Sequence, residues 1–256
     1  MANFPPWVFR VLYKLINRFD KQKQVIFMNY GYSHPEEKVN LDHDDEKNRY
    51  SIQLYHHLIE NVNLSDKIIV EIGCGRGGGL AYIAKKFHPA SLIGIDIEKS
   101  AINFANLQFN YDNLSFKTGN AEKVPLPDKS CDIVLNIESS HRYLTINRFV
   151  DEVKRILRPD GNFLFADFRY PHEWHDLISL IKSAGMRAVM EKDITANILL
   201  ALQKDNTRRL TLVKASTPKI LHKGITNFAG CLGSETYNYF LTRKLTYKSF
   251  VFRNAK

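Results

Sequence analysis

The chain has 256 residues, of which 44% are hydrophobic and 25% are charged. These values are typical of one large globular α/β domain and argue against a disordered chain. No apolar run of about 18 residues occurs, so the sequence excludes a transmembrane helix.

The net charge of +9 is concentrated at the two ends, in residues 1–24 and 203–256, whereas the middle is slightly acidic. A nucleic-acid binder carries its basic stripe beside the reaction site, so we expect no nucleic-acid partner. The basic ends suit attraction to an anionic membrane surface, and a purely solubilising role is the alternative.

The N-terminal sequence and the cysteines predict a cytoplasmic location. Arg10, Lys14 and Arg18 interrupt the apolar residues of the N-terminus, which is therefore a poor secretory signal. The cysteines indicate neither a disulfide framework nor a zinc site, because they are odd in number and unrelated in spacing. They are Cys74, Cys131 and Cys231.

The first predicted element is an amphipathic helix over residues 6–19, in which apolar residues recur at helical spacing from Trp7 to Phe19. Such a helix either packs on the main domain or lies on a membrane. A polar and aromatic loop follows over 27–50, and a second helix is predicted over about 45–62.

The middle of the chain alternates strands with helices. Strands are predicted near 68–72, 91–95, 114–117, 131–136 and 161–167. Helices are predicted near 77–87, 99–108 and 145–157. This alternation predicts a parallel sheet with right-handed crossovers.

The stretch from Leu157 to Gly161 is expected to end a helix, because Pro159 cannot continue it and Gly161 supplies the turn. The later elements are a helix over 172–184 closed by Gly185, a strand near 187–191, helices over 193–210 and 218–225, and a terminal strand within the aromatic-rich stretch 226–256. The predicted fold class is therefore α/β, with a Rossmann-like, doubly wound, mostly parallel seven-stranded sheet and a helical and aromatic cap.

The most informative motif is the glycine-rich stretch 70–78, Val-Glu-Ile-Gly-Cys-Gly-Arg-Gly-Gly, followed by Asp96 at the end of the next strand. This pair is typical of a Rossmann-like sheet that holds a nucleoside, since glycines admit the ligand to the backbone and the acid accepts ribose hydroxyls. Gly73, Gly75 and Gly78 also match the dinucleotide pattern, which alone is a weak signal.

Neighbouring residues favour S-adenosylmethionine (SAM) over a nicotinamide. Glu71 can order the glycine turn or face the sulfonium and amine of SAM, and it would repel a pyrophosphate. Asn120 is placed to hydrogen-bond an adenine, with Ala121 against the ring. A fourth strand leads directly into Glu138-Ser139-Ser140-His141.

Four motifs occur in order within about residues 66–170: Glu-Ile-Gly-Cys-Gly, Gly-Ile-Asp, Asn-Ala-Glu…Leu-Pro and Leu-Arg-Pro-Asp-Gly. In this set the chain resembles the class I SAM-dependent methyltransferases. The resemblance implies that Gly73 and Gly75 abut the cofactor, that Asp96 binds its ribose, and that Ile97 and Ala121 flank its adenine. The other residues expected at the cofactor are Glu71, Cys74, Asn120, Glu122, Glu138 and Tyr30.

A hydroxyl acceptor must lose its proton during methyl transfer, and we expect the base at the carboxyl edge of the sheet. His141 follows the fourth strand and Asp167 ends the fifth, so adjacent strand ends bring them together. Asp167 would orient the imidazole and raise its basicity. The alternatives are a loop histidine bonded to backbone and a strand-end cap.

The stretches 136–143 and 166–169 are similar to an O-methyltransferase subgroup that contains phthiotriol/phenolphthiotriol dimycocerosate methyltransferases and sugar or polyketide tailoring enzymes. This resemblance implies a hydroxyl of a lipid, polyketide or glycoside as acceptor and a histidine as general base. The longer basic N-terminal helix and the basic tail depart from the subgroup and leave the substrate open.

Two further features have alternative interpretations. Tyr30 and Tyr32 either close over the methionyl end of SAM or pack the N-terminal segment onto the sheet. The acidic run Asp42, Asp44 and Asp45 more often caps a helix than holds a cation, so no metal is expected.

We expect one domain made of a helical segment and cofactor-covering loop (1–62), a SAM-binding core (63–192), and a cap with the acceptor pocket and terminal strand (193–256). The expected partner is a hydrophobic small-molecule acceptor, with peripheral membrane contact through the basic ends. The alternatives are a C- or N-methyltransferase on a sterol- or quinone-like ring, for which Glu138 would matter more than His141, and a non-catalytic SAM-binding protein. The oligomeric state is open.

Overall fold

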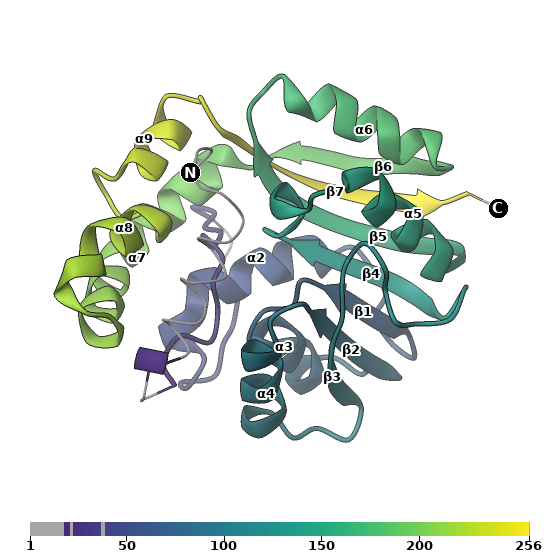
Figure 1. Cartoon of the computed structure of the whole chain (residues 1–256), viewed down its shortest axis with the longest axis horizontal. Helices are drawn as coiled ribbons and strands as arrows, with labels where there is room; N and C mark the ends of the chain where they lie inside the picture. The colour runs from purple at the N-terminus through teal and green to yellow at the C-terminus, as the bar shows by residue number, and fades with distance from the viewer. Residues whose placement is uncertain (1–17, 21–22, 37–38, 256) are drawn as a thin grey trace.

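The computed structural model describes residues 18–20, 23–36 and 39–255 (Figure 1). In this part of the chain seven strands form one sheet, in the order β3-β2-β1-β4-β5-β7-β6. The strands are β1 (Ile68–Ile72), β2 (Ser91–Asp96), β3 (Leu114–Thr118), β4 (Cys131–Ile137), β5 (Leu157–Arg169), β6 (Met186–Asp193) and β7 (Thr246–Asn254). β7 pairs antiparallel with β5 and β6, and the other neighbours pair parallel, which confirms the predicted Rossmann-like sheet.

Helices cover both faces of the sheet, because side chains on each strand alternate between two hydrophobic cores. In β1, for example, Ile69 belongs to one core and Val70 to the other. The first core holds α2 (Arg49–Ile59), α3 (Gly78–Lys86) and α4 (Lys99–Gln108). The second holds α5 (Ile146–Ile156) and α6 (Glu173–Ser183).

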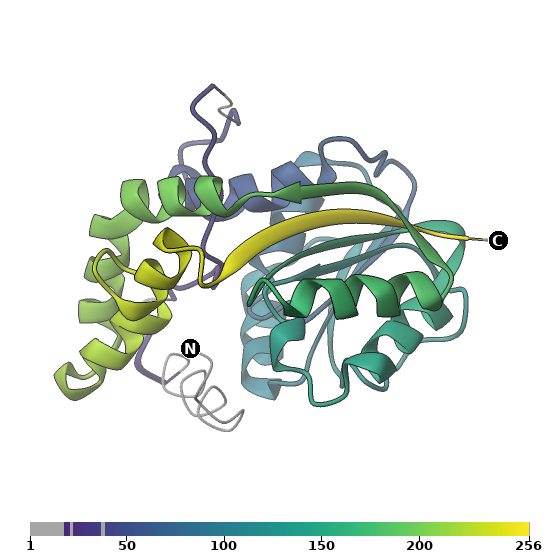
Figure 2. The ribbon, with the colours of Figure 1, turned by 90° about the horizontal axis from the view of Figure 1, so that it is seen from above.

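A helical cap connects β6 to β7 and lies beyond one end of the sheet (Figure 2). It consists of α7 (Thr195–Ser216), a short 3₁₀ turn η3 (Lys219–Leu221), α8 (His222–Phe228) and α9 (Glu235–Leu241). β7 starts opposite the end of β5, where Thr246 pairs with Arg169. The cap therefore stands at the carboxyl edge of the parallel strands, where ligands bind in such sheets.

Several predicted boundaries are wrong. The second helix is shorter than 45–62, since η1 (Glu46–Asn48) precedes α2 and α2 ends at Ile59. The predicted helix 218–225 is divided into η3 and α8, and α9 had no counterpart in the prediction. These parts of the chain are short helices whose ends depend on cap packing that sequence periodicity does not encode.

The predicted turn at Gly161 also needs correction. β5 already begins at Leu157, and its ladder is irregular because β4 advances from Cys131 to Ile133 while β5 advances from Leu157 to Asn162. Asp160, with φ 60°, takes the left-handed conformation. Gly161 is needed for close approach instead, since a Cβ there would lie 2.9 Å from the carbonyl oxygen of Arg158.

The predicted helix 6–19 lies outside the described residues except for its last two positions. No helix among the described residues has the length and apolar character that crossing a bilayer requires. The division of the chain into segments 1–62, 63–192 and 193–256 stays a prediction.

A buried ion pair fixes the start of the segment that covers the carboxyl edge, residues 23–30, hereafter the covering segment. Asp20 and Arg76 are both buried, and Asp20 Oδ2 lies 2.6 Å from Arg76 Nη1. Asp20 also accepts hydrogen bonds from the backbone N–H groups of Gln24 and Val25. Breaking a buried pair leaves an uncompensated charge, so this pair holds the covering segment firmly beside the glycine loop.

Candidate active site

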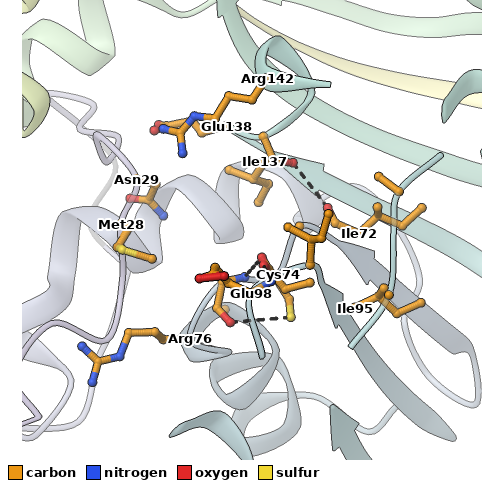
Figure 3. A pocket seen from close by; sticks show the side chains of 18 of the residues that line it. Met28, Asn29, Ile72, Cys74, Arg76, Ile95, Glu98, Ile137, Glu138 and Arg142 are labelled. Atoms are coloured by element: carbon orange, nitrogen blue, oxygen red, sulfur yellow. Dashed lines mark hydrogen bonds between the residues drawn. The ribbon is translucent and has the colours of Figure 1, made fainter. Parts of the chain in front are cut away.

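A cavity of about 230 Å³ opens at the carboxyl ends of β1, β2 and β4 (Figure 3). Its walls include most of the residues predicted for the cofactor: Gly73, Cys74, Gly75, Asp96, Ile97, Asn120, Ala121, Glu122 and Glu138. In Figure 3, Cys74 lies on the glycine-loop side, Glu138 and Arg142 lie across the cavity, and Met28 of the covering segment forms a third side. Glu71 and Tyr30 are absent from the walls.

The glycine loop that leaves β1 is shaped by its backbone. Gly73 has φ 78°, and a Cβ at this position would lie 2.4 Å from Ser139 Oγ. The N–H groups of Gly73 and Cys74 both donate to the carbonyl of Ile95, at 2.7 and 3.1 Å, and so join the loop to the end of β2. This arrangement needs glycine, and it brings the loop backbone to the cavity wall.

Asp96, at the end of β2, accepts hydrogen bonds from two backbone N–H groups, that of Gly75 on Oδ2 and that of Glu98 on Oδ1, both at 2.8 Å. Each carboxylate oxygen retains a further acceptor site for a ligand hydroxyl. Burial raises the pKa of Asp96, partly opposed by these N–H donors. Glu98 Oε2 is buried beside it and has no hydrogen-bond partner among the described residues. These carboxylate oxygens therefore fit the hydroxyl groups of a ribose.

The residues expected around the adenine form the outer wall. Ile97 is 52% exposed, whereas Ala121 is buried. The polar side chains here are used locally: Asn120 Oδ1 accepts the N–H of Glu122, and Glu122 Oε1 accepts the N–H of Thr145. An apolar ring would therefore meet mainly Ile97 and Ala121.

Glu71 does not face the cavity, contrary to one of its two predicted roles. Its carboxyl is fully buried, and Oε1 accepts a 2.7 Å hydrogen bond from the hydroxyl of Tyr55. Oε2 has no partner among the described residues. Burial raises the pKa of Glu71 to about 8. The remaining interpretation is that Glu71 supports the glycine loop from beneath.

Replacement of Glu71 by glutamine is expected to stabilise the free protein at pH 8 and not at pH 5. The raised pKa means that the unfolded chain binds fewer protons than the folded one between about pH 4.5 and 8, so stability falls as pH rises through this range. Glu71→Gln removes that loss, on the order of 4 kcal/mol at pH 8. Denaturant unfolding at both pH values measures it, with the exposed Glu36→Gln as control; parallel pH curves for Glu71→Gln and wild type would contradict the prediction.

Tyr30 packs away from the cavity. Its ring contacts those of Phe168 and Phe240, with centroid distances of 5.5 and 5.4 Å, and its hydroxyl donates to the carbonyl of Phe228. Tyr32 stacks on His57. The packing alternative therefore describes both tyrosines, and the neighbouring Met28 and Asn29 line the cavity instead, with Ile26 and Phe27.

Glu138 follows β4 in an unusual conformation, with φ 48° for a residue that has a Cβ. Its Oε1 accepts the backbone N–H of Tyr30 at 2.8 Å and the hydroxyl of Tyr247 at 3.0 Å. Burial raises the pKa of Glu138 to about 8. Glu138 thereby joins the covering segment to the sheet at the cavity wall.

His141 and Asp167 lie together, as their strand positions predict. His141 Nδ1 is 2.7 Å from Asp167 Oδ1, and the backbone N–H of His141 donates to Asp167 Oδ2. Ser140 Oγ also donates to Oδ2, at 2.6 Å. The carboxylate is fully buried and the imidazole is 15% exposed. Asp167 is therefore rigidly held to orient the His141 ring.

Neutral His141 is the form that this environment favours. Burial lowers the pKa of His141, and Asp167 opposes that shift. Burial would raise the pKa of Asp167, but its interactions with His141, Arg169 and Ser140 hold that pKa well below its usual range. The N–H of Arg142 Nε donates to His141 Nε2 at 3.0 Å. Because arginine only donates, Nε2 carries the lone pair and Nδ1 carries the proton that bonds Asp167.

Arg142 is the main functional candidate that sequence reasoning missed. It lines the cavity described above and also a second, larger one of about 730 Å³. His141 lines only the second cavity. Tyr143 and Leu144 border both. The loop over residues 140–144 thus lies between the 230 Å³ cavity, hereafter the nucleoside cavity, and the second cavity, which His141 lines. An arginine beside a candidate base was the available sequence signal.

Among the described residues, no group of three or more His, Cys, Asp or Glu side chains is arranged to hold a metal ion. In the acidic run, Asp42 and Asp45 form ion pairs with Lys85, and Asp42 also pairs with Lys86. These carboxylates therefore hold the loop before α2 against α3.

Comparison with known proteins finds methyltransferases that are similar to this chain. A family model described as a methyltransferase domain matches residues 70–165. The chain is 35% identical over 220 residues to a fatty-acid O-methyltransferase of Mycolicibacterium smegmatis, covering 86% of this chain and 80% of that protein. It is 32% identical over 246 residues to a phthiotriol/phenolphthiotriol dimycocerosates methyltransferase of Mycobacterium tuberculosis, covering 96% and 91% respectively.

Solved structures agree on the fold. The cyclase SpnF superposes with a TM-score of 0.71 at 14% identity, covering 98% of this chain and 94% of that chain. A geranyl diphosphate C-methyltransferase from Streptomyces coelicolor A3(2) gives a TM-score of 0.69 at 14% identity and covers both chains fully. At these identities the likeness concerns the fold and not the reaction.

Proposed function

Since this chain belongs to the SAM-dependent methyltransferase family, we propose that it transfers a methyl group to an oxygen atom of a long-chain lipid. The two curated relatives support a lipid, because their names specify a fatty acid and phthiotriol or phenolphthiotriol dimycocerosates as substrates. The observation that carries an oxygen acceptor is the His141–Asp167 pair, with its 2.7 Å bond and an unprotonated Nε2 that accepts a hydrogen bond from Arg142.

SAM supplies a methyl group on a positively charged sulfur, so the protein must bind it, orient the acceptor and manage one proton. The proposed cofactor contacts are Gly73, Cys74 and Gly75 along the backbone and Asp96 at the ribose. Ile97, Asn120, Ala121 and Glu122 would surround the adenine, and Glu138 would lie toward the amino acid end. Glu71 and Tyr30 would support this shell from outside it.

For a hydroxyl acceptor, His141 is the proposed general base. Its Nε2 lone pair would take the hydroxyl proton as the oxygen attacks the methyl carbon, and Asp167 would stabilise the imidazolium that forms. The hydrogen bond from Arg142 Nε occupies this lone pair, so Arg142 would have to release it when the hydroxyl arrives.

A carboxylate acceptor is the second candidate, and Arg142 is the observation that favours it. A fatty-acid carboxylate has already lost its proton near neutral pH and needs no base. The guanidinium of Arg142 could bind it in a bidentate manner at the border of the two cavities. In this case His141 would only position Arg142.

The test is incubation of the purified protein with methyl-labelled SAM and either hexadecanol or hexadecanoic acid. Mass spectrometry of the products should show a methyl ether or a methyl ester. Methyl transfer to carbon or nitrogen would support the alternative class of methyltransferase. Binding of SAM without transfer to any offered acceptor would support the non-catalytic interpretation.

Peripheral membrane contact is part of the proposal, because a long-chain lipid resides in membranes and residues 203–256 are basic. Sedimentation with vesicles tests it. We expect the protein to sediment with anionic vesicles and to be released by high salt. Sedimentation of an equal fraction with neutral vesicles would contradict an electrostatic attraction to the membrane.

A further inference from the structure

The second cavity is a groove that starts at His141 and runs between the first turns of α5 and α6; we call it the His141 groove. Its apolar walls come from both helices and from the facing ends of β5 and β7. They include Ile146, Phe168, Tyr170, Leu177, Leu180 and Leu245. At about 730 Å³ it exceeds the nucleoside cavity, and nothing in the proposed cofactor shell uses it.

Polar groups are placed unevenly along this groove. We call the part of the groove formed by the turn after β4 and the end of β5 its inner end, and it carries His141, Arg142 and Arg169. Glu173 and Asp176 line the groove from α6. Arg169 is anchored there, since its Nη2 donates to Ser140 Oγ at 2.8 Å. A ligand that presents oxygen to the inner end and aliphatic carbon to the rest would match this distribution. An anionic group would be repelled by the α6 carboxylates and attracted by the arginines.

We infer that the His141 groove binds the aliphatic chain of the acceptor, with the reacting oxygen held at His141 and the chain lying between α5 and α6. The inference rests on the proposed function and adds the place of the acceptor. The acceptor thus approaches from the opposite side of the 140–144 loop to the cofactor. Transfer needs direct contact between the acceptor oxygen and the methyl carbon, in line with the breaking C–S bond. Arg142, the side chain that borders both cavities, would therefore move aside when the acceptor binds.

The other apolar recess among those near the site is a weaker candidate. It measures about 80 Å³ and lies between the covering segment and the cap, lined by Tyr30, Leu212 and Ile225 among others. His141 is not on its wall. The packed rings of Tyr30 and Phe168 lie between this recess and the His141 ring, which itself contacts Phe168. A chain bound there could not present oxygen to His141 without repacking these rings.

The test is to narrow the groove by introducing tryptophan at exposed positions of the two helices that line it. Asn147→Trp on α5 and Asp176→Trp on α6 place an indole in it, and the exposed neighbours Arg148→Trp and His175→Trp, which line neither cavity, are the matched controls. Losing the burial of about two methylene groups is worth roughly tenfold in binding. We expect KM for hexadecanol and hexadecanoic acid to rise about tenfold in the groove variants. KM for butanol and butanoic acid should change less than twofold.

Equal KM values in groove and control variants, with melting temperatures unchanged, would overturn the inference. A tenfold effect from Leu212→Trp alone would assign the chain to the recess under the cap and would also overturn it. A lower KM for every chain length after removal of residues 1–17 would assign the groove to the chain's own N-terminal segment, which likewise overturns the inference.

Failure of the proposed function is separately detectable. If the wild-type protein methylates none of these lipids, displacement of a fluorescent hexadecanoic acid still tests the groove. Weaker binding of this probe by Asn147→Trp than by Arg148→Trp supports the groove without the reaction. Equal binding by the two variants overturns the groove whatever the reaction is.

Discussion

Replacement of His141 by alanine is expected to lower kcat for a hydroxyl acceptor by roughly two to four orders of magnitude, the range that a positioned general base contributes. SAM affinity should change little, because His141 does not line the nucleoside cavity. Initial rates with hexadecanol and titration calorimetry with SAM measure the two quantities. The exposed His175→Ala on α6 is the control for removal of an imidazole from the surface.

Asp167 acts through His141, so its substitution has a different signature. Asp167→Asn should lower kcat strongly, since an amide can bond the wrong ring tautomer and leave Nε2 protonated. Asp167 raises the pKa of His141, so its loss should move the acid limb of the pH–rate profile to lower pH. A purely structural role would lower the melting temperature and leave the position of that limb unchanged.

The acceptor decides how these results are interpreted. With hexadecanoic acid, His141→Ala should retain most of its kcat if Arg142 binds a carboxylate that needs no base. Full turnover of His141→Ala with hexadecanol would contradict the assignment of His141 as base. Activity confined to the fatty acid would make the carboxylate the acceptor.

The glycine loop and Asp96 could be located from sequence because the signal is local. Two short apolar strands, a glycine turn and a carboxylate at a strand end define one β-α-β unit, and its geometry follows from chain connectivity. The proximity of His141 and Asp167 was predictable for a related reason, since β4 and β5 are adjacent parallel strands. Connectivity fixes where strand ends lie.

Connectivity does not fix where a side chain points, and the errors arise there. Tyr30 turns toward Phe240 and Phe228, which belong to the cap about 200 residues later in the chain. Glu71 points beneath the loop because Tyr55 of α2 offers a hydroxyl there. The bond from Arg142 to His141 Nε2 depends on the short turn after β4, for which periodicity carries no information.

Replacement of Asp96 by alanine is expected to weaken SAM binding by roughly a hundredfold or more. Hydrogen bonds to a charged group contribute about 1.5–3 kcal/mol each, and the carboxylate is proposed to accept two ribose hydroxyls. Titration calorimetry with SAM gives the dissociation constant, and the loss of ligand-induced thermal stabilisation gives an independent value. Asp112→Ala, which removes an exposed carboxylate outside both cavities, is the matched control.

The pH dependence of the same binding separates the ribose role from a structural one. Burial raises the pKa of Asp96, so its protonation on acidification begins at a higher pH than for an exposed aspartate and removes an acceptor. Wild-type affinity for SAM should therefore fall as the pH is lowered, and the affinity of Asp96→Ala should not.

Asp96 also accepts hydrogen bonds from the N–H groups of Gly75 and Glu98, so the variant alone could weaken binding by loosening the loop. Adenosine and its 2′,3′-dideoxy analogue resolve this point: only the ribose role predicts that Asp96→Ala binds the two equally while the wild type prefers adenosine. Equal affinity of the wild type for adenosine and for the dideoxy analogue would refute the ribose contact and leave Asp96 as a loop anchor.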